Sequence, residues 1–206
     1  SLQMRYTDQA YSAMMQLLGS HDTERFLTAC RNGGRGWNRQ ETALARMRLA
    51  VCLQMTMPGM PVVYYGDEVG MEGATDPDCR RPMIWEANSR DAATYEVFRS
   101  MIALRKKHAS LTRGTLRFVF ADEANNAFGF LRQVDGETAY VIINNGTLPY
   151  SVPALPLRDR LGECTMVNGL TGSRYALSAD GQWKETVGPV ATAEAFGCLV
   201  LVTEQE

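Results

Sequence analysis

The sequence lacks most of the features that would place it in a specialised class of protein. Its five cysteines are an odd number without a C-x-x-C pair, which argues against a disulfide framework and a zinc site. With a formal net charge of −2, it has no basic excess for binding nucleic acid. No apolar run approaches the roughly 20 residues that a membrane helix needs. We therefore expect free thiols, no metal site, and neither a nucleic-acid nor a membrane partner.

What remains is the composition of an ordinary globular protein. Hydrophobic residues make up 45% of the chain and charged residues 21%, and its 206 residues suffice for one or two domains. Free thiols fit a reducing compartment, so we expect the protein in the cytoplasm. The first residue is Ser1, and no signal-peptide pattern follows it. We expect Ser1 to mark a boundary within a longer protein.

The first half of the sequence predicts helices that alternate with short buried strands. The run Val62-Val63-Tyr64-Tyr65 is β-branched and aromatic, which is typical of a parallel strand covered on both faces. Leu44, Met47, Val51 and Met55 recur at spacings of three and four, which predicts an amphipathic helix. The expected elements are a helix from Asp8 toward Met15, a strand at 16–18, a helix at 24–30, a loop at 31–36, a helix capped by Asn38 with Glu41 and ended by Pro58-Gly59, a strand at 62–65, a loop at 66–90, and a helix from Asp91 through His108.

Several side chains of this half are expected in its core. Tyr95, Phe98 and Ile102 fall on one face of the last helix. Methionine fills irregular gaps, so we expect core positions for the six methionines at 14, 15, 47, 55, 57 and 60. His108, at the helix end, is expected to be a solvated cap.

The second half predicts an all-β domain. Short alternating segments are separated by turn dipeptides such as Asn125-Asn126, Asp135-Gly136 and Asp180-Gly181, which indicates an antiparallel sandwich. We place the domain boundary between residues 112 and 113. The expected strands are 116–121, 127–134, 138–144, 164–168, 174–177 and 196–203.

The run Ser20-His21-Asp22 stands directly behind the first predicted strand. A histidine and an aspartate at this place put a hydrogen-bond donor and a carboxylate at a strand end, where a sugar's vicinal hydroxyls could bind. The alternative is that Asp22 caps the following helix. Three residues alone do not decide between these interpretations.

The long loop behind the second predicted strand carries further charges. Asp76 and Arg80 are four residues apart and could pair while still offering groups to hydroxyls; the alternative is a surface ion pair. We interpret Glu68 as an anchor of the loop. Trp85 could form part of the wall of the site, but we expect it to pack under the loop. Trp37 could stack on a sugar.

The order of three motifs resembles the last part of the catalytic barrel of α-amylase-type glycoside hydrolases. The motifs are Ser20-His21-Asp22, the run from Gly59-Met60-Pro61 to Glu68, and Asp76-Pro77-x-x-Arg80. The first commonly begins with Asn in the family, whereas the neopullulanase, cyclomaltodextrinase and maltogenic amylase branch frequently has Ser. The resemblance implies a fold of α/β plus all-β class: strands seven and eight of a (β/α)8 barrel with their helices in residues 1–112, then a β-sandwich in residues 113–206.

The resemblance also implies roles for site residues. Asp22 would be the third catalytic carboxylate, and His21 would contact the same sugar. Asp76 and Arg80 would line the first sugar subsite. Calcium is common in the family, but no ligands for it can be assigned in this segment.

What is missing limits the expected activity. The family's nucleophile and acid/base carboxylates sit at strands four and five, and no matching motif occurs in this chain. We therefore expect a fragment of a retaining α-glucan hydrolase that acts on maltodextrins or cyclodextrins and is inactive alone. The alternative is a non-catalytic sugar-binding or interaction module derived from such a barrel. Two parallel strands leave unpaired edges, so we also expect self-association and pairing with the N-terminal remainder of the enzyme.

Overall fold

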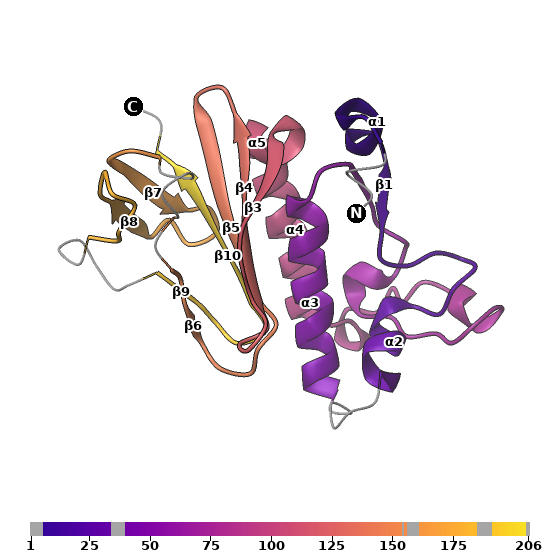
Figure 1. Ribbon diagram of the computed structural model, residues 1–206. Helices are drawn as coiled ribbons and strands as arrows, with labels where there is room; N and C mark the ends of the chain where they lie inside the picture. The colour runs from indigo at the N-terminus through magenta and orange to yellow at the C-terminus, as the bar shows by residue number, and fades with distance from the viewer. Residues whose placement is uncertain (1–5, 34–39, 154, 156–160, 185–190, 205–206) are drawn as a thin grey trace. The chain divides into compact units, whose positions relative to one another are not determined.

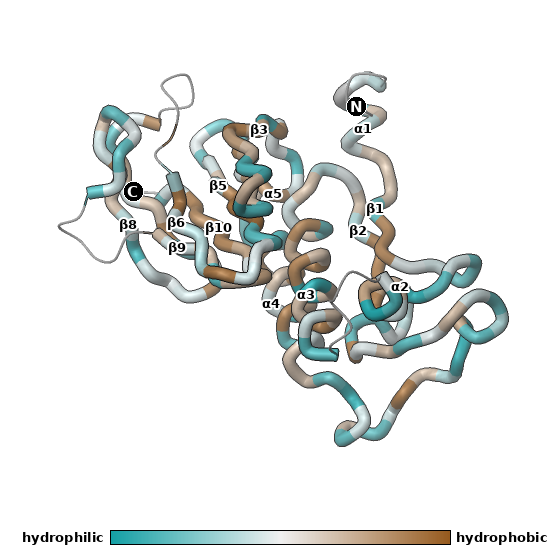
Figure 2. Tube along the Cα trace, turned by 60° about the horizontal axis from the view of Figure 1, so that its bottom comes forward, coloured by the Kyte–Doolittle hydropathy of each residue, from teal (hydrophilic) through white to brown (hydrophobic). Residues whose placement is uncertain are grey.

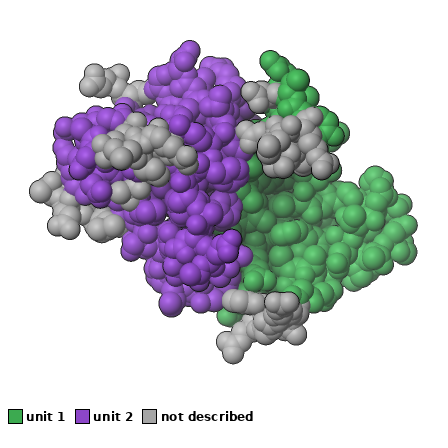
Figure 3. Space-filling model, viewed as in Figure 1, with its two compact units in different colours: residues 1–103 green, residues 104–206 purple. Residues whose placement is uncertain are grey.

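The computed structural model describes residues 6–33, 40–153, 155, 161–184 and 191–204. The chain forms two compact units, Ser1–Ala103 and Leu104–Glu206, which are coloured separately in Figure 3. The division falls inside one helix, nine residues before the boundary expected at 112/113, which stays a prediction. No helix in the described ranges has the length and apolarity to cross a bilayer.

The first unit alternates helices with two short strands (Figure 1). Its observed order follows the predicted order, with ends shifted by a few residues. Thr7, not Asp8, caps the first helix, because its side chain accepts a hydrogen bond from the Ala10 N–H. The elements are α1 Asp8–Ser12, β1 Met15–Leu17, α2 Phe26–Asn32, α3 Gln40–Thr56, β2 Met60–Val62, the 3-10 turns η2 Asp67–Val69, η3 Asp78–Arg80 and η4 Ala87–Ser89, and α4 Ala92–Lys107.

Strands β1 and β2 pair in parallel, with Met15 opposite Met60 and Leu17 opposite Val62. The buried Gln54 of α3 holds both strands, because its Nε2 donates to the carbonyls of Gln16 at 2.7 Å and Val62 at 3.0 Å. The pairing therefore depends on one helix side chain as well as on the strand ladder.

The prediction of a strand at 62–65 was wrong in extent, because the observed strand β2 is Met60–Val62. The chain leaves the ladder after Val62, and the rings of Tyr64 and Tyr65 turn instead toward the Arg25 guanidinium. Burial on both faces was also wrong: Val63 and Tyr65 are exposed, as are Met15, Leu17 and Met60. Figure 2 colours the trace of β1 and β2 by hydropathy.

The core of the first unit lies along α3. Met47, Val51 and Met55 are buried, as their spacing predicted, and Phe98 of α4 is buried too. The assignment of all methionines to the core was wrong for Met15 and Met60, which lie on the open strands. Asp91 caps α4 as predicted, because its Oδ1 accepts from the Thr94 N–H at 2.7 Å. Tyr95, however, is exposed.

The second unit is built on an antiparallel sheet of order β3-β4-β5-β10-β7-β8. All six strands were predicted, whereas the short β6–β9 pair was missed because two-residue strands carry no alternation. The elements are α5 Ala109–Arg113, β3 Thr115–Asp122, β4 Ala127–Val134, β5 Glu137–Asn144, β6 Tyr150–Ser151, β7 Cys164–Asn168, β8 Arg174–Leu177, β9 Thr192–Ala193 and β10 Gly197–Thr203.

One hydrophobic cluster joins the large sheet to the β6–β9 region. Leu131, Ile142, Met166 and Leu201 of the sheet are wholly buried, and Ala193 of β9 belongs to the same cluster. Two antiparallel sheets therefore share a core. The aromatic residues Tyr150, Tyr175 and Trp183 pack against this cluster and form no exposed platform.

His108 is not a solvated cap. It stands at the N-cap of α5, largely buried, with its Nδ1 3.0 Å from Oε2 of Glu137. The other Glu137 oxygen accepts from the Ser110 N–H at 2.7 Å, so this carboxylate ties the start of α5 to β5. Although burial raises the pKa of Glu137, the bonds from Ser110 and His108 outweigh it, and the net shift is downward.

We expect Glu137→Gln to lower the free energy of unfolding at pH 7 by about 1–3 kcal/mol, because a buried partner is lost. The lowered folded-state pKa means that this stabilisation is present above the ordinary value of 4.5 and is lost as the pH falls below it. Urea denaturation at several pH values measures the difference. Asp135→Asn, an exposed carboxylate in the adjacent turn, is the control. Equal stability of both variants at pH 7 would contradict this assignment.

Candidate sugar-binding site

The candidate site is formed by the loops that follow the two parallel strands. Because parallel strands end at the same edge of a sheet, the loop after β1 and the loop after β2 meet there. The first loop carries Ser20-His21-Asp22, and the second carries Asp76 and Arg80 in and beside η3. Segments more than fifty residues apart thus reach one place.

Arg80 joins the predicted site residues. Its Nε lies 2.9 Å from Oδ1 of Asp76, and its Nη2 lies 3.8 Å from Oδ1 of Asp22. The imidazole of His21 completes the group, with Nε2 3.2 Å from the same Asp22 oxygen. All four residues named from the sequence therefore belong to one cluster, whose roles stay a prediction.

The backbone holds the cluster together. The carbonyl of His21 accepts hydrogen bonds from Arg80 Nε at 3.0 Å and from the Cys79 thiol at 3.2 Å. Ser20 Oγ accepts from the Asp22 N–H at 3.2 Å, which closes a tight turn. Asp22 makes no cap for α2, whose N-cap residue is Arg25.

The cluster is open to solvent. The Asp22 side chain is 70% exposed, and Asp76 and Arg80 are about half exposed. Two carboxylates, a guanidinium and an imidazole here combine hydrogen-bond donors and acceptors within a few ångströms. Such a mixture can bind neighbouring hydroxyls of a polar ligand, since each hydroxyl both donates and accepts.

A buried ion pair adjoins the loop that carries Asp22, and sequence reasoning missed it. Arg25 is wholly buried, and its Nη1 donates to Oδ1 of Asp67 at 2.9 Å and to the Tyr65 carbonyl at 2.7 Å. Burial raises the pKa of Asp67 to about 6, against the opposing effect of Arg25. The available signal was an aspartate that opens a loop directly after Gly66 in an otherwise apolar run.

The remaining loop residues have separate roles. Glu68 does anchor its loop, because Oε2 accepts from the Gly66 N–H at 2.7 Å. Asp78 pairs with Arg81, which together with the Ala74 N–H holds the Asp78 pKa below its usual value. Trp37 and Asn38 lie outside the described residues.

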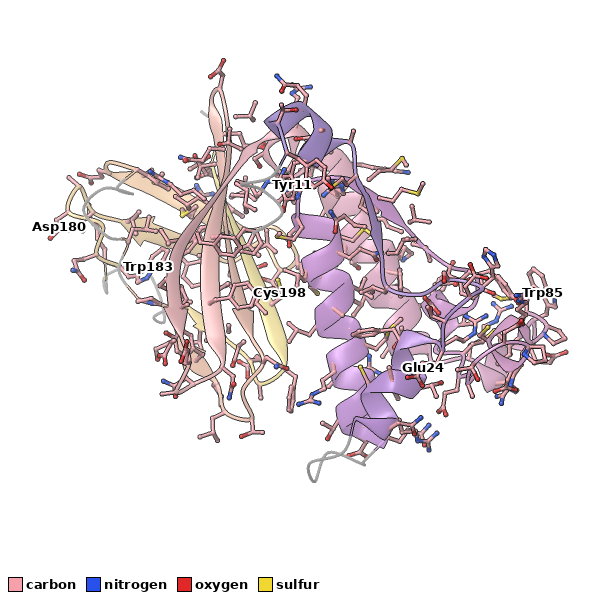
Figure 4. All side chains as sticks on the ribbon, turned by 45° about the vertical axis from the view of Figure 1, so that its right-hand side comes forward. Tyr11, Glu24, Trp85, Asp180, Trp183 and Cys198 are labelled. Carbon is pink, nitrogen blue, oxygen red and sulfur yellow. The ribbon has the colours of Figure 1, made fainter. Side chains whose placement is uncertain are left out.

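Trp85 does not pack under the loop as predicted. Its side chain is 73% exposed, at the outer margin of the loops in Figure 4. Its backbone is fixed, since Arg90 donates to the carbonyls of Ile84 at 3.0 Å and Trp85 at 2.6 Å. The structure therefore presents this indole to solvent on an ordered loop.

The described residues contain no group of three or more His, Cys, Asp or Glu side chains arranged to hold a metal ion. Calcium in a longer protein stays a prediction. Cys30, Cys52, Cys79 and Cys164 carry free thiols, and Cys52 and Cys79 are buried.

Comparisons with known proteins identify relatives of this chain in one family. Residues 2–95 match the family model of the α-amylase catalytic domain. The chain is 44% identical over 186 residues to neopullulanase 2 of Thermoactinomyces vulgaris, covering 90% of this chain and 30% of that protein. It is 36% identical over 141 residues to the intracellular maltogenic amylase of Bacillus subtilis, covering 68% of this chain and 22% of that protein.

Solved structures show the same fold. A cyclomaltodextrinase structure matches with a TM-score of 0.72 at 31% identity, over 97% of this chain and 31% of that one. An Anoxybacillus α-amylase matches with a TM-score of 0.79 at 24% identity, over 98% of this chain and 40% of that one.

The chain spans less than a third of the length of the curated relatives named above. Within that span, the similarity runs through both units, because the matches cover most of the chain. The chain belongs to the α-amylase family, in the branch of the neopullulanases, cyclomaltodextrinases and maltogenic amylases.

Proposed function

We propose that this chain is part of a retaining glycoside hydrolase that acts on maltodextrins or cyclodextrins. The observation that carries the proposal is the convergence of Asp22, His21, Asp76 and Arg80 at the ends of two parallel strands. The names of the relatives, neopullulanase and cyclomaltodextrinase, agree with this substrate class. In this proposal β1 and β2 are strands seven and eight of a (β/α)8 barrel, and the second unit is its β-sandwich.

Each residue of the cluster has a role in this proposal. Asp22 is the third catalytic carboxylate and accepts hydrogen bonds from vicinal hydroxyls of the sugar at the cleavage point. These bonds strengthen in the transition state, where charge develops on the ring. His21 donates to the same sugar. Arg80, held by Asp76, donates to hydroxyls at the first subsite.

The chain alone does not complete the reaction. Retaining hydrolysis needs a nucleophile and an acid/base carboxyl about 5–5.5 Å apart. By the family resemblance, these come from polypeptide that precedes this segment in a full-length enzyme. Asp22 is tied to an arginine and a histidine, which suits binding and charge stabilisation rather than covalent attack.

In this proposal the exposed strands β1 and β2 pair with further strands. Met15, Leu17, Met60 and Val63 expose apolar side chains, and among the described residues β1 and β2 pair only with each other. Exposed strand edges pair readily with other strands. The remainder of the same barrel is the proposed partner, and the isolated chain self-associates through this surface. A cytoplasmic location is proposed from the free thiols and from a relative named as intracellular.

We expect no maltodextrin turnover by the 206-residue chain. In a full-length enzyme that carries this segment, Asp22→Asn should lower kcat by about 100- to 1,000-fold, because transition-state stabilisation is lost. Asp78→Asn, which removes a loop carboxylate paired with Arg81, is the control and should retain most of the activity. Reducing-sugar release measures both. Turnover by the isolated chain, or full activity of Asp22→Asn, would refute the proposal.

Binding by the isolated chain can be followed through its two histidines. Titration with maltoheptaose should shift the NMR signals of the His21 ring, which lies in the site, and leave those of His108 unchanged. The Asp22→Asn variant should bind more weakly. Shifts of both rings, or of neither, at millimolar sugar would count against a sugar site at His21.

Self-association should depend on the open strands. Light scattering of the isolated chain is expected to give a mass above that of one chain, falling toward it in the Met15→Lys/Met60→Lys variant, since charge on a strand surface opposes pairing. Leu148→Lys changes an exposed leucine of the second unit and is the control. A monomer at every concentration would show that these edges do not associate.

A further inference from the structure

Asp67 contacts both ends of the loop that carries Asp22. Its Oδ1 lies 2.9 Å from Arg25 Nη1, just behind the loop. At the other end it lies against Gly19, where an added Cβ would come within 2.9 Å of Oδ2. Gly19 is buried, and Asp67 itself is only 3% exposed. One buried carboxylate therefore touches the residues on either side of positions 20–24.

Arg25 is held from several sides. The rings of Tyr64 and Tyr65 lie 4.5 and 4.9 Å from its guanidinium carbon. Its backbone N–H donates to the Gly73 carbonyl at 2.9 Å. Its Nε and Nη2 are buried without a hydrogen-bond partner in the described part of the chain. Asp67 is thus the one charged group that its side chain contacts among the described residues.

We propose that Asp67 is a positioning residue, which fixes the Gly19–Arg25 segment and thereby places the Asp22 carboxylate beside His21 and Arg80. The inference rests on the proposed function, since it gives a purpose to the placement of Asp22. Asp67 does not touch the sugar in this account. Its effect reaches the site through the five residues between its two contacts.

The electrostatics of the pair support positioning over stability. Removing both charges from water is costly, and such pairs contribute little net stability. Burial raises the pKa of Asp67 to about 6, so its ionised form at pH 7 is destabilising relative to an exposed carboxylate. A pair that adds little net stability but contacts both ends of the loop that carries Asp22 is better explained by the geometry that it fixes.

Asp67→Asn tests the proposal in this chain, with Asp91→Asn as the matched control. Asp91 also pairs with an arginine at 2.9 Å in the same unit, but it caps α4 and does not contact residues 19–25. We expect Asp67→Asn to shift the His21 ring signals of the free protein and to weaken maltoheptaose binding about tenfold or more. Asp91→Asn should lower the unfolding temperature while leaving the His21 signals and the affinity unchanged.

Gly19→Ala provides a second variant if Asp67→Asn folds poorly. Its Cβ would press on Oδ2 from the other side, so it should shift the same His21 signals. Unchanged His21 signals in both variants, or an equal shift in Asp91→Asn, would overturn the proposal. The free-state spectra are independent of sugar. If Asp67→Asn shifts His21 but the wild-type chain binds no maltoheptaose, positioning stands and the proposed function fails.

Discussion

The parallel pairing of β1 with β2 is the constraint on which the site depends. Parallel strands end at one edge, so the residues behind β1 and those behind β2 meet although the sequence separates them widely. Gln54 bonds to a carbonyl of each strand. Gly59, at φ +106°, makes the approach possible, because any Cβ there would lie 2.5 Å from the Met14 carbonyl oxygen. Without this pairing, Arg80 would not reach Asp22.

The candidate site contains an exposed group of charged residues and a buried ion pair, and the two differ in character. The cluster of Asp22, His21, Asp76 and Arg80 is exposed, so each of its ion pairs adds little stability. Its polar groups can exchange water for a ligand. The Arg25–Asp67 pair is buried, and the rings of Tyr64 and Tyr65 pack against the Arg25 guanidinium. A rigid buried pair next to an accessible cluster is the combination that preorganised binding requires.

The sequence predicted the order of the elements, because this depends on local patterns. The four residues that it named as a candidate site lie in one exposed cluster, and their role stays a prediction. It could not predict features that depend on neighbours distant in the sequence. Val62–Tyr65 reads as a buried strand, yet Tyr64 and Tyr65 leave the ladder for Arg25. Trp85 and Tyr95 were expected to be covered and are exposed, since apolar character does not specify a partner. The pairing of Asp67 with Arg25 was missed because the two residues lie more than forty positions apart in the sequence.

The central claim is that Asp22 and Arg80 bind one sugar. A crystal structure of maltoheptaose bound to a full-length enzyme that carries this segment tests it most directly. The account predicts the Asp22 carboxylate within about 2.6–3.2 Å of two hydroxyls of a single glucose ring, with Arg80 bonded to the same ring or its neighbour. A glucan bound elsewhere, or an Asp22 side chain turned away from the sugar, would contradict it.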